Sequence, residues 1–392
     1  MKKIYLDYAA TTPTDPDILE RMLPYFGADY GNPSSMYESG RRAKSVIETS
    51  RKKIALCCNA DPEEIIFTGS GTEADNMAIF GVARANRAHG NHIIISSIEH
   101  KAIIEPAHQL EKEGFRISVL PVDCYGMIDI GECLKLITPE TILISVMYVN
   151  NEIGTIQPIA GLTAAVRLQR GSRGFPLVHT DACQAAGFLT LDVHELGVDL
   201  MTINSSKIYG PKGVGMLYKR KGVNLIPLIV GGDQEKRMRA GTENVALIFG
   251  FAEALEKVSA GRECDSERVR DLRDYFIKEL KRKIPELELN GHPTERLPNN
   301  VHVSIHAVEG ESMILMLDRE GISASTGSAC SAFDLKPSHV LLAIRQNEEI
   351  IHGSIRFTMG KHTTRDDLDH VLDVFPVIVE NLTRLSAIRK NI

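Results

Sequence analysis

Short apolar runs alternate with helical segments between residues 63 and 245 of this 392-residue chain. The runs cover residues 65–67, 92–96, 117–120, 142–146, 177–179 and 200–203. Strands that alternate with helices form βαβ units, in which the strands are parallel and helices cover both faces of the sheet. We therefore expect an α/β fold whose large domain has a mainly parallel, doubly wound sheet.

The pattern of elements changes near residue 246. The sequence predicts a long amphipathic helix over about 254–283, strands near 300–305 and 355–357, and a last helix from about 364. These elements are typical of a smaller α+β domain. Since a chain of this length is too long for one small core, we expect two domains. The large domain is expected over 15–253, and the small domain over 1–14 and 254–392.

Composition and charge argue against several classes of protein. The net charge of −6 disfavours nucleic acid or an anionic membrane surface as the main partner. No apolar run approaches the ~18 residues of a membrane span, and no apolar segment typical of a secretory signal follows the N-terminal lysines. The seven cysteines include no Cys-x-x-Cys pair. We therefore expect a cytoplasmic protein without a resident metal, in which a special cysteine would be a reagent.

Lys207 follows the apolar run that ends at Ile203, after a small polar cluster of Asn204, Ser205 and Ser206. The glycines and proline of Gly210-Pro-Lys-Gly213 follow it and cannot continue a strand or a helix. This pattern predicts a strand that presents one lysine at its end. Such a lysine can react with a carbonyl group if its surroundings lower its pKa, although an isolated lysine there would usually be a solvated surface group.

A glycine turn between a strand and a helix start lies around Gly69 and Gly71. Backbone N–H groups at the helix start, together with the hydroxyl of Thr72, would form an anion site. The spacing Gly69-x-Gly71-x-x-Ala74 also matches the loose dinucleotide motif, and Glu99 ends the next strand. The motif alone therefore leaves both a phosphate site and a nicotinamide dehydrogenase open.

His100 and Asp181 each lie at or just beyond the end of an apolar strand. This is the edge at which open α/β sheets bind ligands. Taken alone, however, His100 could be a structural histidine and Asp181 a helix cap. A carboxylate is the partner that a pyridinium nitrogen needs. Combined with Lys207 and a phosphate site, Asp181 favours pyridoxal 5′-phosphate, since hydride transfer from a nicotinamide needs no lysine.

Two further residues are candidates for chemistry in the C-terminal part. Cys330 lies in a run of small residues, where the thiol is either accessible and reactive or merely a small side chain. Arg356 interrupts a strand-like run. It is either a half-exposed edge residue or a bidentate clamp for a carboxylate.

Together these segments closely resemble the cysteine desulfurases of the NifS/IscS type, within the class V aminotransferase group. The resemblance runs from residue 5 to about residue 385. It is carried by Leu6-Asp-Tyr-Ala-Ala-Thr-Thr-Pro13, Gly31-Asn-Pro-Ser-Ser35, Thr72-Glu, Glu99-His100, Asn150-Asn-Glu-Ile-Gly154, Asp181-x-x-Gln184, Lys207-x-Tyr-Gly-Pro-Lys-Gly213, Arg239-Ala-Gly-Thr242 and Ser328-Ala-Cys330. It implies the pyridoxal phosphate fold type I and a homodimer.

The resemblance also implies a role for each matching residue. The catalytic residues are Lys207 as the Schiff-base lysine, His100 as the residue that stacks on the ring and passes protons, and Cys330 as the sulfur acceptor. The cofactor-binding residues are Gly71, Thr72, His100, Asn151, Asp181, Gln184, Asn204, Ser206, Lys207, and Thr242 of the partner subunit. The substrate-binding residues are Asn32, Asn151 and Arg356.

The reaction implied by the resemblance converts L-cysteine to L-alanine. The sulfur passes as a persulfide on Cys330 to a protein acceptor, such as an iron–sulfur scaffold or a tRNA-thiolation enzyme. Cys330 would then also be a transient ligand of an assembled cluster. No direct contact with nucleic acid or membrane is expected.

The chain departs from the usual family pattern beside the Schiff-base lysine. Ser206 stands where a histidine is usual, and Asn204 where a serine is usual. Both side chains can donate hydrogen bonds, so we expect altered phosphate anchoring rather than loss of the cofactor. Alternative functions are another class V activity, selenocysteine lyase or aminotransferase, and a non-catalytic sulfur-transfer scaffold.

Overall fold

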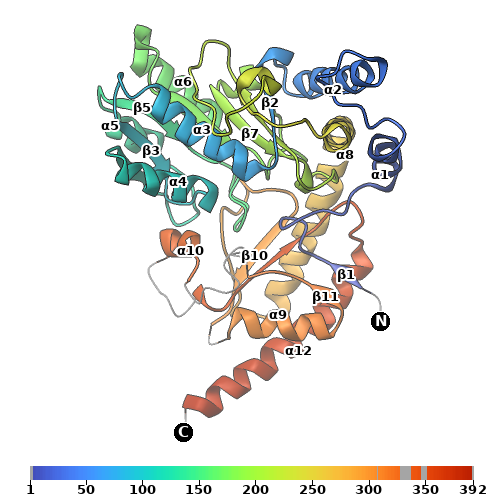
Figure 1. Ribbon diagram of the computed structural model, residues 1–392. Coiled ribbons are helices and arrows are strands. Elements are labelled where there is room, and N and C mark those ends of the chain that lie inside the picture. Colours follow the sequence, from blue (N-terminus) through green and yellow to red (C-terminus); the bar gives the residue numbers. More distant parts are fainter. Residues whose placement is uncertain (1–2, 307, 327–336, 346–350, 391–392) are drawn as a thin grey trace.

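A seven-stranded sheet forms the centre of the computed structural model, which describes residues 3–306, 308–326, 337–345 and 351–390 (Figure 1). Its strand order is β2-β8-β7-β6-β5-β3-β4. The strands are β2 (Ile65–Thr68), β3 (His92–Ser96), β4 (Arg116–Leu120), β5 (Thr141–Ser145), β6 (Leu177–Asp181), β7 (Leu200–Asn204) and β8 (Gly215–Lys219). Strands β3 to β7 pair in parallel, whereas β8 is antiparallel to both neighbours. The predicted α/β fold with a mainly parallel sheet is confirmed.

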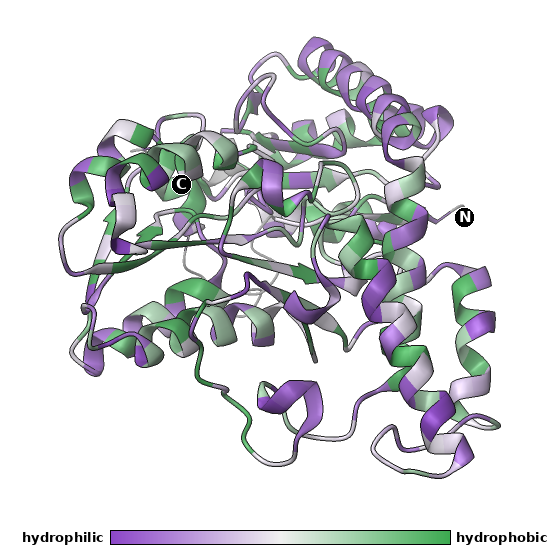
Figure 2. Cartoon of the chain, turned by 90° about the horizontal axis from the view of Figure 1, so that it is seen from above, coloured by the Kyte–Doolittle hydropathy of each residue, from purple (hydrophilic) through white to green (hydrophobic). Residues whose placement is uncertain are grey.

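Helices cover both faces of this sheet (Figure 1). They are α1 (Pro16–Met22), α2 (Glu38–Cys57), α3 (Gly71–Ala85), α4 (Lys101–Lys112), α5 (Ile130–Leu136), α6 (Ile159–Arg170), α7 (Val193–Leu196) and the first part of α8 (Val245–Lys283). Figure 2 shows hydrophobic residues along the central strands, while the surrounding helices carry hydrophilic residues as well. Within the part of the chain that the structure describes, no helix is long and apolar enough to cross a membrane.

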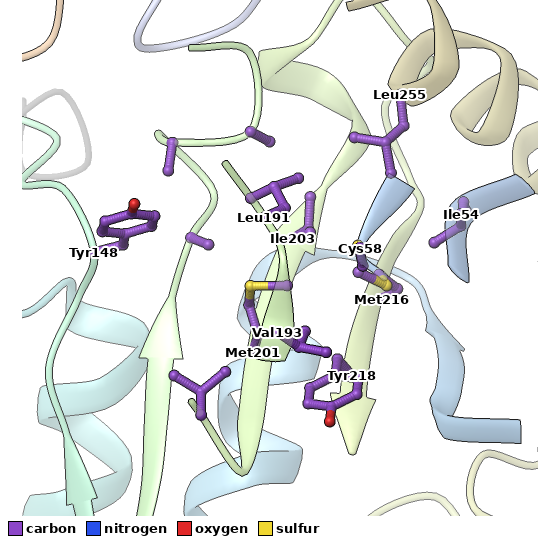
Figure 3. Packing of buried hydrophobic residues seen from close by; sticks show 14 of the residues in the cluster. Ile54, Cys58, Tyr148, Leu191, Val193, Met201, Ile203, Met216, Tyr218 and Leu255 are labelled. Carbon is purple, nitrogen blue, oxygen red and sulfur yellow. The ribbon is translucent and has the colours of Figure 1, made fainter. Parts of the chain in front are cut away.

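Each face of the sheet has its own apolar cluster. Ile93 and Ile95 pack with residues of α3 and α4, whereas Ile94 packs in the cluster that contains residues of α2, α6 and α8. Successive side chains of a strand point to opposite faces, so a strand buried on both faces has the continuous apolar run seen in the sequence. Figure 3 shows the second cluster, in which Met201 and Ile203 of β7 lie near Met216 of β8.

A smaller unit follows the sheet in the chain. Its three-stranded antiparallel sheet has the order β12-β10-β9, and its other strands, β1 and β11, pair in parallel. The elements are β1 (Ile4–Tyr5), β9 (Glu288–Leu289), β10 (Asn300–Ser304), α9 (Gly310–Arg319), β11 (Ile322–Ser323), α10 (His339–Ile344), β12 (Ser354–Thr358) and α12 (Arg365–Lys390). The N-terminal strand therefore lies beside C-terminal residues (Figure 1).

We propose a division into a large domain of 15–253 and a small domain of 1–14 with 254–392. Phe251 of α8 belongs to a cluster on the central sheet, whereas Phe276 of the same helix belongs to the cluster of the small sheet. The proposed boundary therefore falls inside one continuous helix. A shared helix of this length would hold the two units in a fixed relation.

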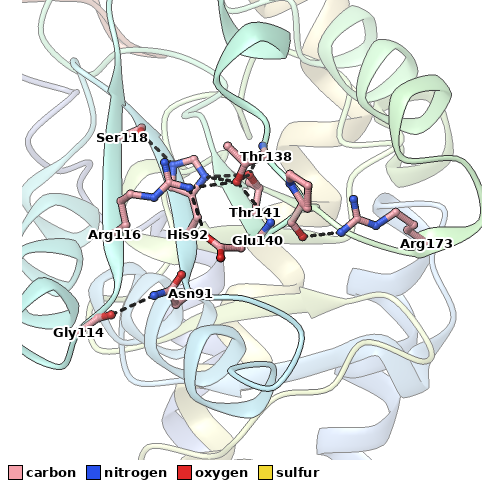
Figure 4. Close-up of polar contacts among 10 residues, drawn as sticks. Asn91, His92, Gly114, Arg116, Ser118, Thr138, Glu140, Thr141 and Arg173 are labelled. Atoms are coloured by element: carbon pink, nitrogen blue, oxygen red, sulfur yellow. Dashed lines mark hydrogen bonds and ion pairs between the residues drawn. The ribbon is translucent and has the colours of Figure 1, made fainter.

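Polar side chains join the strands at the end of the sheet where β3 and β5 begin (Figure 4). The two ring nitrogens of His92 lie 2.8 Å from Oγ1 of Thr141 and 2.8 Å from Oγ of Ser118. Burial, with a smaller contribution from Arg116, lowers the pKa of His92 to about 4, so the ring is neutral at physiological pH. We therefore assign a structural role to this polar cluster. The candidate active site lies at the opposite, carboxyl end of the strands.

Candidate active site

Lys207 lies just beyond the end of β7, in a short 3₁₀ turn over Ser205–Lys207. Its Nζ donates a hydrogen bond to the backbone oxygen of Ala10 in the N-terminal segment. Thr12 fastens that segment, because its N–H and its hydroxyl both donate to the carbonyl of Ser206, at 2.8 and 3.0 Å. The N-terminal segment and the end of β7 thus fix the position of the lysine together.

A cavity of about 310 Å³ opens beside Lys207. Nine of the residues predicted from the sequence line it: Gly71, Thr72, His100, Asn151, Asp181, Gln184, Asn204, Lys207 and Arg356. Asp181 is the last residue of β6 and Asn204 the last of β7, and these two strands are paired neighbours. The cavity therefore lies at the carboxyl edge of the parallel strands, where open α/β sheets bind ligands.

The wall of the cavity at Gly71 is suited to an anion. Gly71 is the first residue of α3, and the side chain of Ser70 caps the helix by accepting the N–H of Glu73 at 3.1 Å. A Cβ atom at Gly71 would lie 2.8 Å from Sγ of Cys183, so a larger residue would displace its neighbours. Oδ1 of Asn204 is buried and has no hydrogen-bond partner among the described residues. The first N–H groups of a helix also lack partners within it, so this wall offers unused polar groups.

Carboxyl groups gather at the floor of the cavity. Asp75 and Asp181 both line it, and burial together with the charge of Asp181 raises the pKa of Asp75. Glu99 is not among the lining residues, but burial raises its pKa as well, to about 8. The backbone N–H of Cys183 donates to Oδ1 of Asp181 at 2.9 Å, and burial raises the pKa of the Cys183 thiol. Burial thus favours the protonated form of Glu99 at neutral pH and the neutral thiol of Cys183.

Arg356 is the residue through which the small sheet contributes to the cavity wall. It lies in β12, and its side chain is buried. Nη1 donates to the backbone oxygen of Asn151 at 2.7 Å, and Nη2 lies 2.8 Å from Oδ1 of Asp7. The interpretation of Arg356 as a half-exposed edge residue is therefore wrong. Its guanidinium group is oriented by two fixed oxygens, as a carboxylate clamp requires.

Three of the predicted residues that the structure describes do not line the cavity, and a fourth is not described. Asn32 is exposed, and its Oδ1 accepts the N–H of Ser34. Ser206 contributes its carbonyl to Thr12, as described above. Thr242 lines a different cavity, which it shares with Gly69 and Arg239. Cys330 lies outside the described residues. The roles of these four residues stay predictions.

The chain on both sides of residues 327–336 reaches the cavity. Ser325 exchanges two backbone hydrogen bonds with Arg356, at 2.6 and 3.1 Å. On the other side, Oγ of Ser338 donates to Oε2 of Glu152 at 2.5 Å, and His339 lines the cavity. The described residues that flank 327–336 in the chain therefore lie at the cavity or in contact with its lining residues.

Asp75 and His339 also line the cavity, although they were not among the residues predicted from the sequence. Asp75 follows Gly71 by four residues in α3, a spacing that puts both residues on one face of a helix and could have identified it. No motif marks His339, apart from its nearness to Cys330 in the chain.

Known proteins resemble this chain over nearly its whole length. The family model of the class V aminotransferases matches residues 4–371. The cysteine desulfurase IscS of Dictyoglomus turgidum is 50% identical over 386 residues, which cover 98% of this chain and 96% of the relative. The cysteine desulfurase IscS of Methanosarcina thermophila is 48% identical over 98% of this chain and 94% of its own length.

Solved structures give the same result. A NifS-like protein is 34% identical and superposes with a TM-score of 0.90 over 97% of this chain and 100% of its own. A structure described as SspA in complex with cysteine is 32% identical, with a TM-score of 0.81 over 93% of this chain and 100% of its own.

The chain belongs to the class V aminotransferase family, a family of pyridoxal phosphate enzymes. Its relatives show, more narrowly, that its function is that of a cysteine desulfurase.

Proposed function

We propose that this cavity binds pyridoxal 5′-phosphate and L-cysteine, and that sulfur leaves it as a persulfide on Cys330. The observation that carries the proposal is that one cavity joins the amine of Lys207, the carboxyl group of Asp181 and the helix start at Thr72. These three groups match the aldehyde, the ring nitrogen and the phosphate of the cofactor. The solved relative described in complex with cysteine supports L-cysteine as the substrate.

The described residues fit this cofactor. Asp181 would pair with the pyridine nitrogen, His100 would stack on the ring, and Gln184 and Asn151 would flank the ring hydroxyl. The N–H groups of Gly71 and Thr72 and the amide of Asn204 would hold the phosphate, together with Ser206 and the partner's Thr242. The unpartnered Oδ1 of Asn204 can be exchanged for the amide NH₂ by rotation about χ2, which would turn a donor toward an anion. When bound, pyridoxal phosphate withdraws electrons from the substrate's α-carbon.

Substrate orientation would come from the guanidinium group of Arg356, with Asn32 and Asn151 as further contacts to the carboxylate. Because Asp7 and the carbonyl of Asn151 hold Arg356 in place, little ordering is needed when the carboxylate binds. The amine of Lys207 would take the proton from the α-carbon. The thiolate of Cys330 would attack the substrate sulfur, and the β-carbon would gain a proton, so that L-alanine leaves.

We further propose a cytoplasmic homodimer that passes the sulfur to a protein acceptor, such as an iron–sulfur scaffold or a tRNA-thiolation enzyme. In that role Cys330 would be a transient ligand of an assembled cluster. The position of Thr242, which lines a cavity other than that of Lys207, supports a contribution to the partner's site.

Two variants test the assignment of Lys207 and Cys330. Lys207→Ala should lose the visible absorbance of the lysine-bound cofactor, because the amine proposed to bind the cofactor's carbonyl carbon is removed. Cys330→Ala should keep the absorbance and change it when L-cysteine is added, but sulfide release should fall by at least about 100-fold. Alanine and sulfide are assayed together in the presence of a thiol reductant, and wild type should give equal amounts.

Cys264→Ala serves as the matched control, since Cys264 is an exposed free cysteine, and its turnover should equal that of wild type. A normal visible band in Lys207→Ala would refute the lysine assignment. Undiminished sulfide release from Cys330→Ala would remove Cys330 from the mechanism. Cofactor binding without alanine or sulfide from wild type would favour the sulfur-transfer scaffold.

A further inference from the structure

His339 lines the same cavity and has no role in the function proposed so far. It is the first residue of α10, a short helix that packs through Val340 and Leu341 against Ile98 and Met147 in a separate apolar cluster. These apolar contacts fix the helix against the chain that follows β3 and β5. The imidazole is therefore carried by a well-anchored element.

The polar contacts at the start of α10 hold the same position. Oγ of Ser338 accepts the N–H of Leu341 at 3.2 Å, which caps the helix, and it donates to the buried carboxyl group of Glu152. Glu152 also lines the cavity. The backbone of His339 is thus tied to the cavity wall through its neighbour.

The hydrogen bond of the imidazole defines its neutral tautomer. Nε2 of His339 lies 2.9 Å from the backbone oxygen of Glu99. A carbonyl oxygen can only accept, so the neutral ring must carry its proton on Nε2. Nδ1 then has a lone pair, and none of the described residues donates to it. Nδ1 of this cavity-lining residue is therefore a nitrogen that can accept a proton.

His100 has the opposite arrangement. Its Nδ1 accepts the backbone N–H of Ala102 at 3.1 Å, so the neutral ring carries its proton on Nε2 and can act there only as a donor. Two histidines with complementary roles therefore line one cavity. Desulfuration needs both roles, because the substrate thiol loses a proton and the β-carbon gains one.

We propose that Nδ1 of His339 takes the proton of the substrate thiol during sulfur transfer, an inference that rests on the proposed function of the cavity. The thiolate of Cys330 supplies the electron pair of the new S–S bond. The bond between the substrate sulfur and the β-carbon breaks, and its electron pair stays on carbon. The thiol proton moves to Nδ1, which gives an imidazolium and an anionic persulfide. The carbon then gains a proton, so charge and atoms balance without an external oxidant or reductant.

The test compares two substrates that differ in their need for a base. The selenol of L-selenocysteine is far more acidic than a thiol and is already ionised at neutral pH, so its transfer needs no proton acceptor. His339→Gln retains an N–H donor for the carbonyl of Glu99 but has no basic nitrogen. We expect turnover of L-cysteine to fall on the order of 100-fold and turnover of L-selenocysteine to change by less than about threefold.

A second variant distinguishes a role of His339 as a base from a purely structural role. His339→Ala leaves room for a small molecule, and added imidazole should restore part of the L-cysteine turnover, because it supplies the missing basic nitrogen. A residue that only shapes the cavity or positions the neighbouring segment would not be replaced by a free base. His108→Gln, at an exposed position of α4, is the control and should behave like wild type in all assays.

The outcomes are separable from those of the proposed function. Both variants should keep the visible cofactor band and its change on adding L-cysteine, which tests the cavity independently of His339. Wild-type turnover of L-cysteine by His339→Gln would overturn the inference, as would equal losses with both substrates or no rescue of His339→Ala by imidazole. Failure of wild type to form alanine would instead contradict the proposed function.

Discussion

Glu99 gives the stability of the folded protein a measurable pH dependence. Burial raises its pKa from 4.5 to about 8, so between these values the folded protein binds a proton that the unfolded chain releases. The stabilising contribution is complete below the unfolded pKa and is lost as the pH rises toward 8. The unfolding free energy of wild type should therefore decrease between about pH 5 and 8. Glu99→Gln has a side chain that is neutral at every pH, and it should reduce the slope of this decrease by up to about 1.4 kcal/mol per pH unit.

Denaturant unfolding at several pH values measures this slope. Glu111→Gln, at an exposed position of α4, should leave the slope unchanged. Part of the slope should remain in Glu99→Gln, because the pKa of Asp75 is also raised. Identical slopes for wild type and Glu99→Gln would show that Glu99 is ionised in the folded protein.

The cavity residues that were predictable from the sequence lie at the ends of strands. Asp181 and Lys207 could be brought together because the carboxyl ends of parallel strands share one edge, and Thr72 because a helix starts there. Arg356 comes from another sheet, so its place at the cavity followed only from the family resemblance. The tautomer of His339 depends on a backbone carbonyl more than 200 residues away in the chain, and no sequence pattern encodes such a contact.

At the scale of elements, the segment between β8 and α8 depends on one buried ion pair. Glu235, Lys236 and Arg237 all have positive φ angles, of 45°, 57° and 68°, which are unfavourable for residues with a Cβ. Arg51 of α2 binds the carboxylate of Glu235 through two nitrogens, at 2.7 and 2.9 Å. The backbone N–H of Phe67 also donates to this carboxylate, at 2.8 Å. These contacts hold the segment in its strained conformation.

Glu235→Ala should therefore be strongly destabilising. It removes the carboxylate that binds two nitrogens of the buried Arg51 and, among the described residues, leaves Arg51 only the carbonyl of Ile65 and the more distant carboxylate of Glu48 as acceptors. Breaking a buried ion pair in this way costs about 3–5 kcal/mol. Asp233→Ala removes an exposed ion pair with Arg237 in the same segment and should cost less than about 1 kcal/mol. Urea unfolding of both variants measures the difference, and similar midpoints would contradict a stabilising role for the buried pair.

The sequence predicted most elements, and the exceptions have physical reasons. The run at 92–96 coincides with β3, whereas β8 was not predicted: it is five residues long, begins with a glycine and follows a glycine-rich turn. The long helix begins at Val245 rather than near 254. Its first turns are apolar on all sides because they are buried against the central sheet, so they lack the amphipathic pattern of a surface helix.

At the scale of the whole molecule, the segment with Glu235 also connects the anion site to a different cavity. Nε of Arg239 lies 2.9 Å from Oε1 of Glu73, and Oε2 of Glu73 accepts the N–H of Gly69 at 2.9 Å. Thr242 follows three residues after Arg239 and lines the cavity that includes Gly69. In the proposed homodimer, this segment would join the anion site of one subunit to the site of the other.

Mixed dimers can test whether Thr242 acts across the subunit boundary. Thr242→Ala alone should weaken binding of pyridoxal phosphate by about 10-fold or more, because a hydrogen bond to a charged group contributes about 1.5–3 kcal/mol. A dimer of one Lys207→Ala subunit and one Thr242→Ala subunit would then contain one site with both residues intact, formed by Lys207 of one chain and Thr242 of the partner subunit. That dimer should bind one equivalent of cofactor with wild-type affinity and have about half the wild-type turnover. If Thr242 acted within its own chain, both sites would be defective, and the mixed dimer would show only the weak binding of the Thr242→Ala protein.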